Sequence, residues 1–590
     1  MPSHNRCLRY RESQDDEAPL SGVIVMLALG LALFCFFKVI LTLRRDYSSL
    51  LMDEDIYATT FWRSDQAGRF ELNSWSISTL LGYYFLWKVW AIGFGKSLFA
   101  MRLLSTTLCV SGVIAGFVVL RHTGFSRRDS WIWSLVILGT PALFLSQYFM
   151  SDAPVFAATV VFWALVLAVP RCRYPILAAS SAFVVIGYAC TVRQTAVFSA
   201  LGGCVWLILP RVALAARIRC CCLVWLCLCL LSTAVCKHHV DQEPYNTNDA
   251  KLAGFSESGF VLANCKSYTP GKTLNFSNQA LVSLFTIAAV PLTLFGFASF
   301  VSHFRNLGAS RFGIMVLGWA VLTIFLTTVS YCRRFGVLGS ALSPAVVALT
   351  GWDYGGPSSE VGRMTAAVLL ICCLGWGFLL LKCAGFATLV GAVANCTRDD
   401  RFRNERVLAC LATLPAIATI GACLWHGLVI CPRYLISSLP ALLLLWRAVL
   451  VRGVTGLSMR AVSWYAFASV AVLGVCNVLQ FYDSLRFSEA SWSAREQYQK
   501  TRQGFPEVLT SSHNGFAAHG TTRDLALRFP ESSPKLWFQG QDYTLKLERL
   551  DPLKGSANNV GEILVPLTVY MPPKSVAYKA IGVRSNEAPK

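Results

Sequence analysis

The chain has 590 residues, of which 55% are hydrophobic and 14% are charged, and its formal net charge is +20. A soluble domain usually has about 25% charged residues, so this composition excludes an ordinary soluble protein and indicates a polytopic membrane protein. Most basic residues lie in short loops between apolar segments, a distribution that sets membrane topology and is not typical of a nucleic-acid-binding surface. We therefore expect membrane lipid as a partner, and no nucleic acid.

The first apolar segment, residues 21–43, is long enough to cross a bilayer core of about 30 Å as a helix. It is too long, and too poor in small residues at its end, for a cleaved signal peptide, so residues 1–20 are expected to be a cytoplasmic leader. Asp53 and Glu54 follow this span closely. Acids beside a membrane are costly to desolvate, which makes them candidates for a functional site. The alternative is a solvated loop that holds the turn after the span.

Further apolar segments of spanning length follow along the chain and bring the total to about thirteen. Segment 75–94 is not counted, because it contains Lys88 and is rich in Trp and Tyr, which prefer the membrane interface. We expect its aromatic side chains to be interfacial anchors, and the alternative is that they stack on a substrate. These residues are Trp75, Tyr83, Tyr84, Trp87 and Trp90. The predicted spans lie near 21–43, 98–120, 130–149, 153–170, 174–191, 195–210, 219–236, 279–301, 312–330, 364–382, 407–425, 434–450 and 461–481.

The arginines of alternate loops predict an orientation with the N-terminus inside. This orientation places Asp53 outside, in the periplasm of a bacterium or the lumen of a eukaryotic organelle. The fold class is thus an all-α transmembrane domain over residues 21–481, with interfacial helices in an outer loop at 44–97. The polar tail, residues 482–590, contains the strand-like runs DYTLKLERL and EILVPLTVYM. We expect it to form a small outer domain of α/β or β type.

Asp152 is a lone acid between two apolar runs, at their predicted outer end. One interpretation is a helix N-cap before Pro154. The other is a site shared with Asp53, where carboxylates accept a proton from a hydroxyl group or hold a cation near a phosphate. A divalent cation is compatible with such a site, but no cofactor is implied. The cysteines lack zinc-site spacing, so no metal ligands are assigned.

Some arginines depart from the positive-inside distribution, because they lie at predicted outer ends of spans. Guanidinium groups there suit a lipid-linked phosphate or diphosphate. The alternative is that their side chains extend to the interface from membrane depth. The four arginines are Arg193, Arg333, Arg334 and Arg433.

Several short motifs occur in a fixed order. The outer Asp53-Glu54 pair and the aromatic segment precede an R-L-L-S element at Arg102–Ser105. Asp152 and an R-Q-T element at Arg193–Thr195 follow, and P-R-Y-L-x-x-x-L-P occupies Pro432–Pro440. In order, spacing and sidedness this set resembles the integral-membrane glycosyltransferases of the C-type fold, over most of residues 21–450.

Two branches of that family are similar to the chain. The bacterial branch includes protein O-mannosyltransferases and lipid A aminoarabinose transferases, which have a DE loop, a similar span count and an outward C-terminal domain. The other branch, the dolichyl-phosphate-glucose α-1,2-glucosyltransferases, has an M-D-E start, echoed by Met52–Glu54. Its tryptophan-acid-proline stretch is replaced here by Trp75-Ser76-Ile77. The soluble tail also fits the bacterial branch better, although Ser78–Leu80 stands where that branch often has a proline pair.

The resemblance implies transfer of a sugar from a polyprenyl-phosphate donor to a lipid, glycan or protein acceptor, with inversion, on the outer face. It implies Asp53 as the general base, Glu54 as its support and Asp152 as part of the same site. Arg193 and Arg433 are implied to hold the donor phosphate. The expected location is a bacterial cytoplasmic membrane with a periplasmic site, and the alternative is the endoplasmic reticulum membrane.

A transporter or flippase of lipid-linked sugars is the alternative function. Such a protein would carry charges near the middle of the bilayer and broken helices in matching halves. Here the acids cluster at one face and no two-half symmetry is visible, which favours the enzyme. A non-catalytic scaffold would not need acids and arginines on one side.

Overall fold

The computed structural model describes residues 54–70, 78–123, 149–209, 214–242 and 403–425, three strands near the C-terminus, and isolated positions between them. The first predicted span therefore lies outside the described residues. The same holds, wholly or largely, for the predicted spans at 130–149, 279–301, 312–330, 364–382, 434–450 and 461–481.

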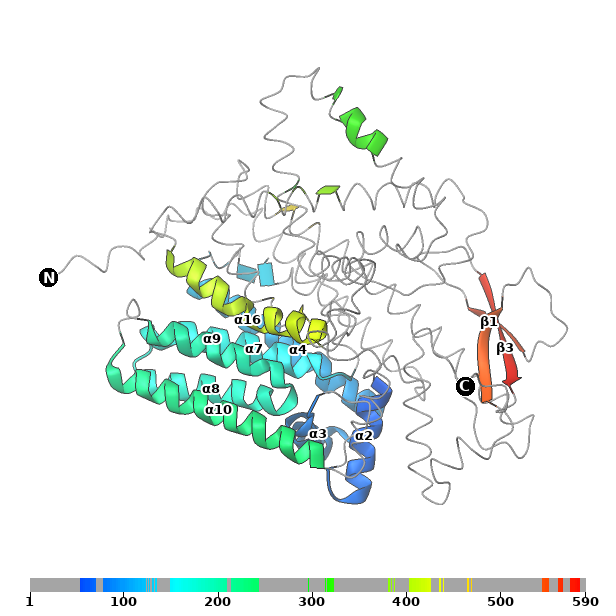
Figure 1. Ribbon diagram of the computed structural model, residues 1–590, viewed down its shortest axis with the longest axis horizontal. Helices are drawn as coiled ribbons and strands as arrows, with labels where there is room; N and C mark the ends of the chain where they lie inside the picture. Colours follow the sequence, from blue (N-terminus) through cyan, green and yellow to red (C-terminus); the bar gives the residue numbers. More distant parts are fainter. Residues whose placement is uncertain are drawn as a thin grey trace.

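Within the described part, four helices are long and apolar enough to cross a membrane. They are α4 (Leu98–His122), α7 (Asp152–Ala168) with its extension η1 (Val169–Arg171), α8 (Pro175–Val192) and α10 (Ala216–Gln242). Each coincides with a predicted span, so the chain is a membrane protein built on apolar helices, as expected. Figure 1 shows these helices side by side.

Two further helices pack with this group. A turn, η2 (Gln194–Ala196), connects α8 to α9 (Val197–Ile208), and α16 (Arg403–Trp425) packs against α9. Both helices contain apolar stretches that are shorter than a span. A Cβ atom on Gly202 would lie 2.6 Å from the Leu411 carbonyl oxygen. The absence of a side chain therefore lets α9 approach α16 closely, which is how small residues act between membrane helices.

Side-chain contacts give the direction of each helix. Arg171 donates to the His122 carbonyl oxygen, so α4 and α7 finish at the same end of the bundle. Arg193, just after α8, pairs with Asp152 at the start of α7, so α8 returns to the opposite end. The two ends are called here the Arg171 end and the Asp152 end. Helix α10 runs parallel to α8, since Trp225 bonds to Ser180 and, further along both helices, Cys229 bonds to the Phe183 carbonyl.

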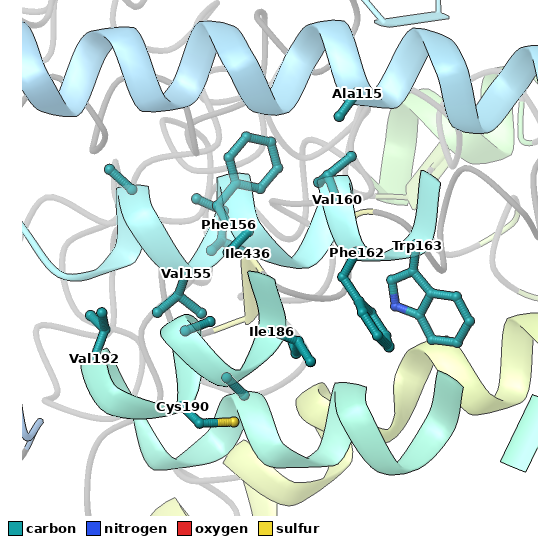
Figure 2. Close-up of a cluster of buried hydrophobic side chains, with 14 of the residues drawn as sticks. Ala115, Val155, Phe156, Val160, Phe162, Trp163, Ile186, Cys190, Val192 and Ile436 are labelled. Carbon is teal, nitrogen blue, oxygen red and sulfur yellow. The ribbon is translucent and has the colours of Figure 1, made fainter. Parts of the chain in front are cut away.

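The core of the bundle is apolar and closely packed (Figure 2). Phe156, Phe162 and Trp163 of α7 are buried, with 2% exposure or less. A Cβ atom on Gly112 of α4 would lie 2.5 Å from the Phe156 ring, and one on Gly203 of α9 would clash with Phe162. Glycine is therefore required where the large rings of α7 face neighbouring helices.

Helices α2 (Glu54–Ala67) and α3 (Leu81–Phe94) lie beside the start of α4 (Figure 1). Each has 14 residues, or about 21 Å of helix, which is shorter than a bilayer core. Helix α3 presents Phe85, Val89 and Ile92 as an exposed apolar stripe, with Ile92 87% exposed. This length and this face suit a helix that lies at the membrane surface.

The aromatic side chains of α3 lie elsewhere than expected. Tyr83, Tyr84 and Trp87 are buried against Phe61 of α2, at ring-centroid distances of 5.4–5.5 Å, and Phe149 lies 5.1 Å from Phe61. The prediction that these three residues are interfacial anchors is wrong. Helix α2 covers them, so they join the two short helices to each other instead of facing lipid.

Three strands form an antiparallel sheet in the C-terminal tail, in the order β1-β3-β2. They are β1 (Thr544–Leu550), β2 (Gly561–Val565) and β3 (Lys574–Val583). Strand β1 lies within the first run predicted as a strand, β2 overlaps the start of the second run, and β3 pairs with both. The outward placement of this tail as a domain stays a prediction.

Candidate active site

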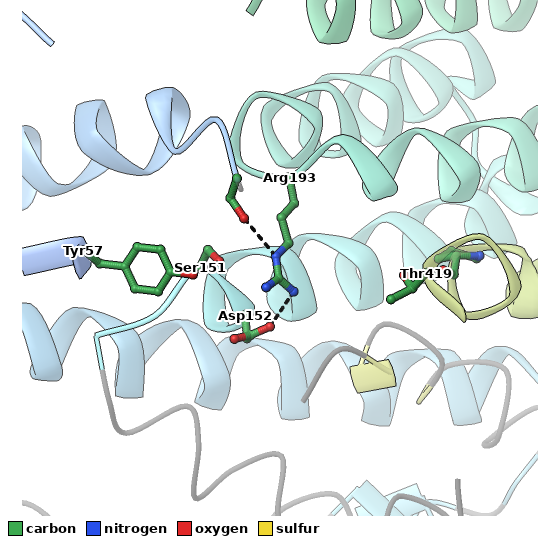
Figure 3. A network of polar contacts seen from close by, with 7 residues as sticks. Tyr57, Ser151, Asp152, Arg193 and Thr419 are labelled. Atoms are coloured by element: carbon green, nitrogen blue, oxygen red, sulfur yellow. Dashed lines mark hydrogen bonds and ion pairs between the residues drawn. The ribbon is translucent and has the colours of Figure 1, made fainter. Parts of the chain in front are cut away.

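The site is organised around residues 149–152, a short segment that leads into α7. Its residues contact two other parts of the chain, helix α2 and the end of α8. The Phe149 N–H donates to Glu54 Oε1 at 3.0 Å, and the Ser151 hydroxyl donates to the Tyr57 phenol oxygen at 3.4 Å. Asp152 pairs with Arg193 (Figure 3). The segment thereby links helix α2, the first turn of α7 and the end of α8.

Glu54 and Arg102 form a buried ion pair between α2 and α4. Arg102 Nε donates to Glu54 Oε1 at 2.8 Å, and Nη2 donates to Oε2 at 2.6 Å. Both side chains have 0% exposure. This two-pronged geometry uses the planar fork of the guanidinium and fixes the carboxylate plane. Both oxygens of Glu54 therefore accept hydrogen bonds from Arg102.

Asp152 and Arg193 form the second ion pair. Arg193 Nη1 donates to Asp152 Oδ1 at 2.6 Å. The Asp152 side chain is 1% exposed, and the Arg193 side chain is 16% exposed. Asp152 Oδ2 is buried and has no hydrogen-bond partner among the described residues. The N-cap position of α7 belongs to Ser151, so Asp152 is not the N-cap and instead pairs with Arg193.

Residues 78–80 bind the end of α8. Thr79 donates from its hydroxyl to the Thr191 carbonyl at 2.8 Å, and the Leu80 N–H donates to the Val192 carbonyl at 3.2 Å. Arg193 Nε donates to Ser78 Oγ at 3.3 Å. The last carbonyl groups of a helix lack hydrogen-bond partners within the helix. Residues 78–80, called the strap, donate to these carbonyls of α8 and also accept a hydrogen bond from Arg193.

Leu80 has a left-handed backbone, with a φ of 57°. This conformation costs a residue with a Cβ about 1–2 kcal/mol. Strained residues concentrate at functional sites, and here the strain falls where the strap turns into α3 beside Arg193. In the sequence, Ser78–Leu80 is predicted only to depart from a proline pair. The signal that could have indicated the strap is a Ser-Thr pair of hydrogen-bonding side chains directly before an apolar helix.

Several predicted site residues fall outside the described part. From the P-R-Y-L motif, Leu435, Ile436 and Leu439 are described and buried. Helix α16 also reaches η2, the turn after Arg193, and Thr419 of this helix is drawn with the pair in Figure 3. The residues outside the described part are Asp53, Arg333, Arg334 and Arg433.

Tyr83 contacts the site region as a neutral group. Its phenol lies 2.8 Å from the Ser105 hydroxyl, and both residues are buried. Burial raises the pKa of Tyr83 well above its usual value, so the phenol stays protonated. Ser105 closes the R-L-L-S element, and this contact explains why a hydroxyl is placed there.

The two ends of the bundle differ in charge. The Asp152 end carries the two ion pairs, and the Arg171 end carries unbalanced basic residues among the described positions. Arg171 contacts His122 there, with Nη1 at 3.1 Å from Nδ1. Arg173 and Arg217 are exposed at the same end. No group of three or more His, Cys, Asp or Glu side chains that could hold a metal ion occurs among the described residues.

No model of a known protein family and no curated protein sequence matches the chain. Solved structures do resemble it. ArnT from Cupriavidus metallidurans in the apo state has 14% identity and a TM-score of 0.40, over 97% of this chain and 100% of that one. The same protein bound to undecaprenyl phosphate has 16% identity and a TM-score of 0.38, over 94% and 97%.

The Archaeoglobus fulgidus oligosaccharyltransferase in the apo form has 14% identity and a TM-score of 0.39, over 85% of this chain and 64% of that one. ArnT is an aminoarabinose transferase, and both proteins are membrane glycosyltransferases of the C-type fold.

Proposed function

We propose that the protein transfers a sugar from a polyprenyl-phosphate donor to an acceptor on the outer face of a membrane. The observation that supports this most is Arg193. It lies at the Asp152 end of an apolar bundle, where the headgroup of a membrane lipid would be, and its guanidinium is oriented by Asp152 and Ser78. A fixed, partly exposed guanidinium at that level suits a lipid phosphate.

In the proposed reaction, an acceptor hydroxyl attacks the anomeric carbon of the donor sugar. The bond between this carbon and the phosphate oxygen breaks, which inverts the configuration, and the phosphate leaves with the bonding electrons. Arg193 stabilises the negative charge that develops on the phosphate, and Arg433, Arg333 and Arg334 are further candidates for this role. Preorganised charge of this kind usually gives the largest part of such a rate enhancement.

Asp53 is the proposed general base that takes the proton from the acceptor hydroxyl. Glu54 is occupied by Arg102 and by the Phe149 N–H, which leaves its neighbour as the acid for this task. General base catalysis by a positioned side chain contributes roughly 10²–10⁴-fold. Asp152 orients Arg193, and its second oxygen is a candidate acceptor for a hydroxyl of the donor or acceptor.

The proposed acceptor is an envelope lipid, a glycan or a protein. The proposed location is a bacterial cytoplasmic membrane with the site facing the periplasm, and the alternative is the endoplasmic reticulum membrane. The charge distribution supports this sidedness, because the exposed arginines of the Arg171 end follow the positive-inside rule. The two ion pairs of the site lie at the start or end of helices, which supports an enzyme over a transporter.

Transfer from labelled polyprenyl-phosphate sugars, measured in membranes with envelope acceptors, tests the proposal. Wild type should transfer label from one donor class, and Asp53→Asn should lose roughly a thousandfold of the rate, because the base is removed. Asp65→Asn is the matched control on α2. Asp65 lies 2.5 Å from Lys96 and apart from the ion pairs of the site, so this variant should keep the wild-type rate.

Two results would contradict the proposal. The first is transfer by Asp53→Asn at the wild-type rate. The second is no transfer by wild type across mannose, glucose, galactose and aminoarabinose donors. In the second case, movement of the labelled lipid across the membrane would support the transporter alternative.

A further inference from the structure

We infer that Arg102 is a positioning residue, which acts through Glu54 to hold the start of α2 and the segment 149–152 together. This inference rests on the proposed function. Arg102 has 0% exposure and lies on α4, so it acts on the reaction through its neighbours and not by contact with donor or acceptor. It forms an ion pair with Glu54, the residue directly after Asp53 in the sequence.

Hydrogen bonds connect Arg102, through Glu54, to the segment that contains Asp152. Arg102 fixes the plane of the Glu54 carboxylate with two hydrogen bonds, of 2.8 and 2.6 Å. The oxygen that accepts from Nε also accepts the Phe149 N–H at 3.0 Å, three residues before Asp152. One carboxylate is therefore bound at the same time to α4 and to the segment that leads into α7. The start of α2 cannot shift relative to Asp152 unless these bonds break.

A second contact runs alongside the first. The Ser151 hydroxyl donates to the phenol oxygen of Tyr57, one helical turn after Glu54. The segment 149–152 is thereby attached to α2 at two points, of which the Glu54 contact has the shorter hydrogen bond. Two attachments restrict rotation as well as translation, which is what the alignment of a base with a reacting hydroxyl requires.

Adhesion between helices does not by itself require this ion pair. Replacement of a buried ion pair by apolar residues of similar volume is often neutral or stabilising. The surroundings already supply apolar contact, since the buried Phe61 of α2 packs on the buried Tyr83 of α3, and Tyr83 in turn contacts Ser105 of α4. What an apolar pair cannot supply is an oxygen that accepts the Phe149 N–H in a fixed direction. This difference separates a positioning role from a purely structural one.

Arg193 has a support that does not involve this pair. Ser78 accepts a hydrogen bond from its guanidinium, and the strap at residues 78–80 binds the end of α8. Loss of the Glu54–Arg102 pair should therefore lower kcat and leave the KM for the donor nearly unchanged. A role in donor binding would instead raise that KM.

Two double variants test the inference. Glu54→Met with Arg102→Met removes the ion pair and the side-chain oxygen that accepts the Phe149 N–H. Glu54→Gln with Arg102→Met removes both charges but keeps an oxygen acceptor at position 54. Both are measured for amount in the membrane, thermal stability and transfer. We expect near-wild-type stability in both. We expect kcat to fall roughly a hundredfold in the first variant and roughly tenfold in the second, at a donor KM within about threefold of wild type.

Arg102→Lys is the test variant if the double variants do not fold. It keeps a positive charge beside the buried Glu54 but loses the two parallel hydrogen bonds of the guanidinium. It should lower kcat roughly tenfold at an unchanged donor KM. Wild-type kcat in the Met/Met variant, equal rates in the two double variants, or a raised donor KM with unchanged kcat would overturn the inference. If the double variants do not fold, wild-type kcat in Arg102→Lys overturns it. Failure of the proposed function would look different, because wild type itself would then transfer no sugar.

Discussion

Two kinds of neighbour hold Arg193. Asp152 neutralises much of its charge from one side, and Ser78 accepts from Nε on the other. An arginine held in this way loses little side-chain entropy when it binds a ligand, because its rotamer is already selected. The burial of Asp152 is therefore explained by its ion pair with Arg193, whose side-chain orientation it fixes.

Replacement of Arg193 should weaken donor use. Hydrogen bonds to charged groups contribute about 1.5–3 kcal/mol, so Arg193→Ala should raise the donor KM by roughly ten- to a hundredfold. Arg193→Lys keeps the charge but cannot form hydrogen bonds with Asp152 and Ser78 at the same time. Its donor KM should therefore lie between those of wild type and Arg193→Ala. Arg173→Ala, at the Arg171 end, should leave the donor KM unchanged. Titration of the labelled donor measures all three, and equal KM values for wild type and Arg193→Ala would remove the proposed role.

At the scale of elements, the site depends on how closely α3 approaches the end of α8. Gly82 allows this approach, since a Cβ atom there would clash with the Thr191 hydroxyl and lie 3.2 Å from the Tyr188 ring. The strap before α3 then reaches the last carbonyls of α8. Sequence patterns describe each helix well, but such an approach depends on which helices become neighbours.

Gly82→Ala should separate α3 from α8. Inserting a methyl group into a packed contact costs about 1–3 kcal/mol, and the shift should also lower transfer because the strap holds Arg193. Gly93→Ala on the same helix is the control, as a Cβ there meets no atom within 4 Å. Thermal unfolding of the purified proteins in detergent compares them. Equal stability of the two variants would show that the close approach at Gly82 is not required.

At the scale of the whole molecule, one end of the bundle has the two ion pairs of the site, and the other end has exposed basic residues. The alternating directions of α7, α8, α9 and α10 bring Asp152 and Arg193 together, although 41 residues separate them in the sequence. The same alternation brings Arg171 to His122 at the other end. A polar site and a basic end separated by apolar helices is the arrangement expected of an enzyme that works at one membrane face.

Epitope tags should report opposite sides for the two ends. A tag after Lys96, between α3 and α4, should be labelled by antibody in intact cells, and so should a tag after Lys590. A tag after Arg173, between η1 and α8, should be labelled only after permeabilisation, because the basic residues hold this loop inside. Labelling of the Arg173 tag in intact cells would overturn the proposed orientation, and protection of the Lys590 tag would place the tail inside.

The sequence by itself determined the membrane class, because a span needs only length and hydropathy, and both are local. It also determined the positions of α4, α7, α8 and α10, and it singled out Glu54, Asp152 and Arg193 as unusual for their sidedness. Charges at the ends of apolar segments are costly, so they stand out without any knowledge of their neighbours.

Only the tertiary structure decided which acid meets which arginine. Nothing local in the sequence pairs Glu54 with Arg102 or Asp152 with Arg193, because these contacts depend on the order in which helices pack. The burial of Tyr83, Tyr84 and Trp87 was likewise decided by α2, which covers a face that composition alone assigns to the membrane interface. Hydropathy is a property of each segment, whereas a hydrogen bond between distant residues is a property of the assembled bundle.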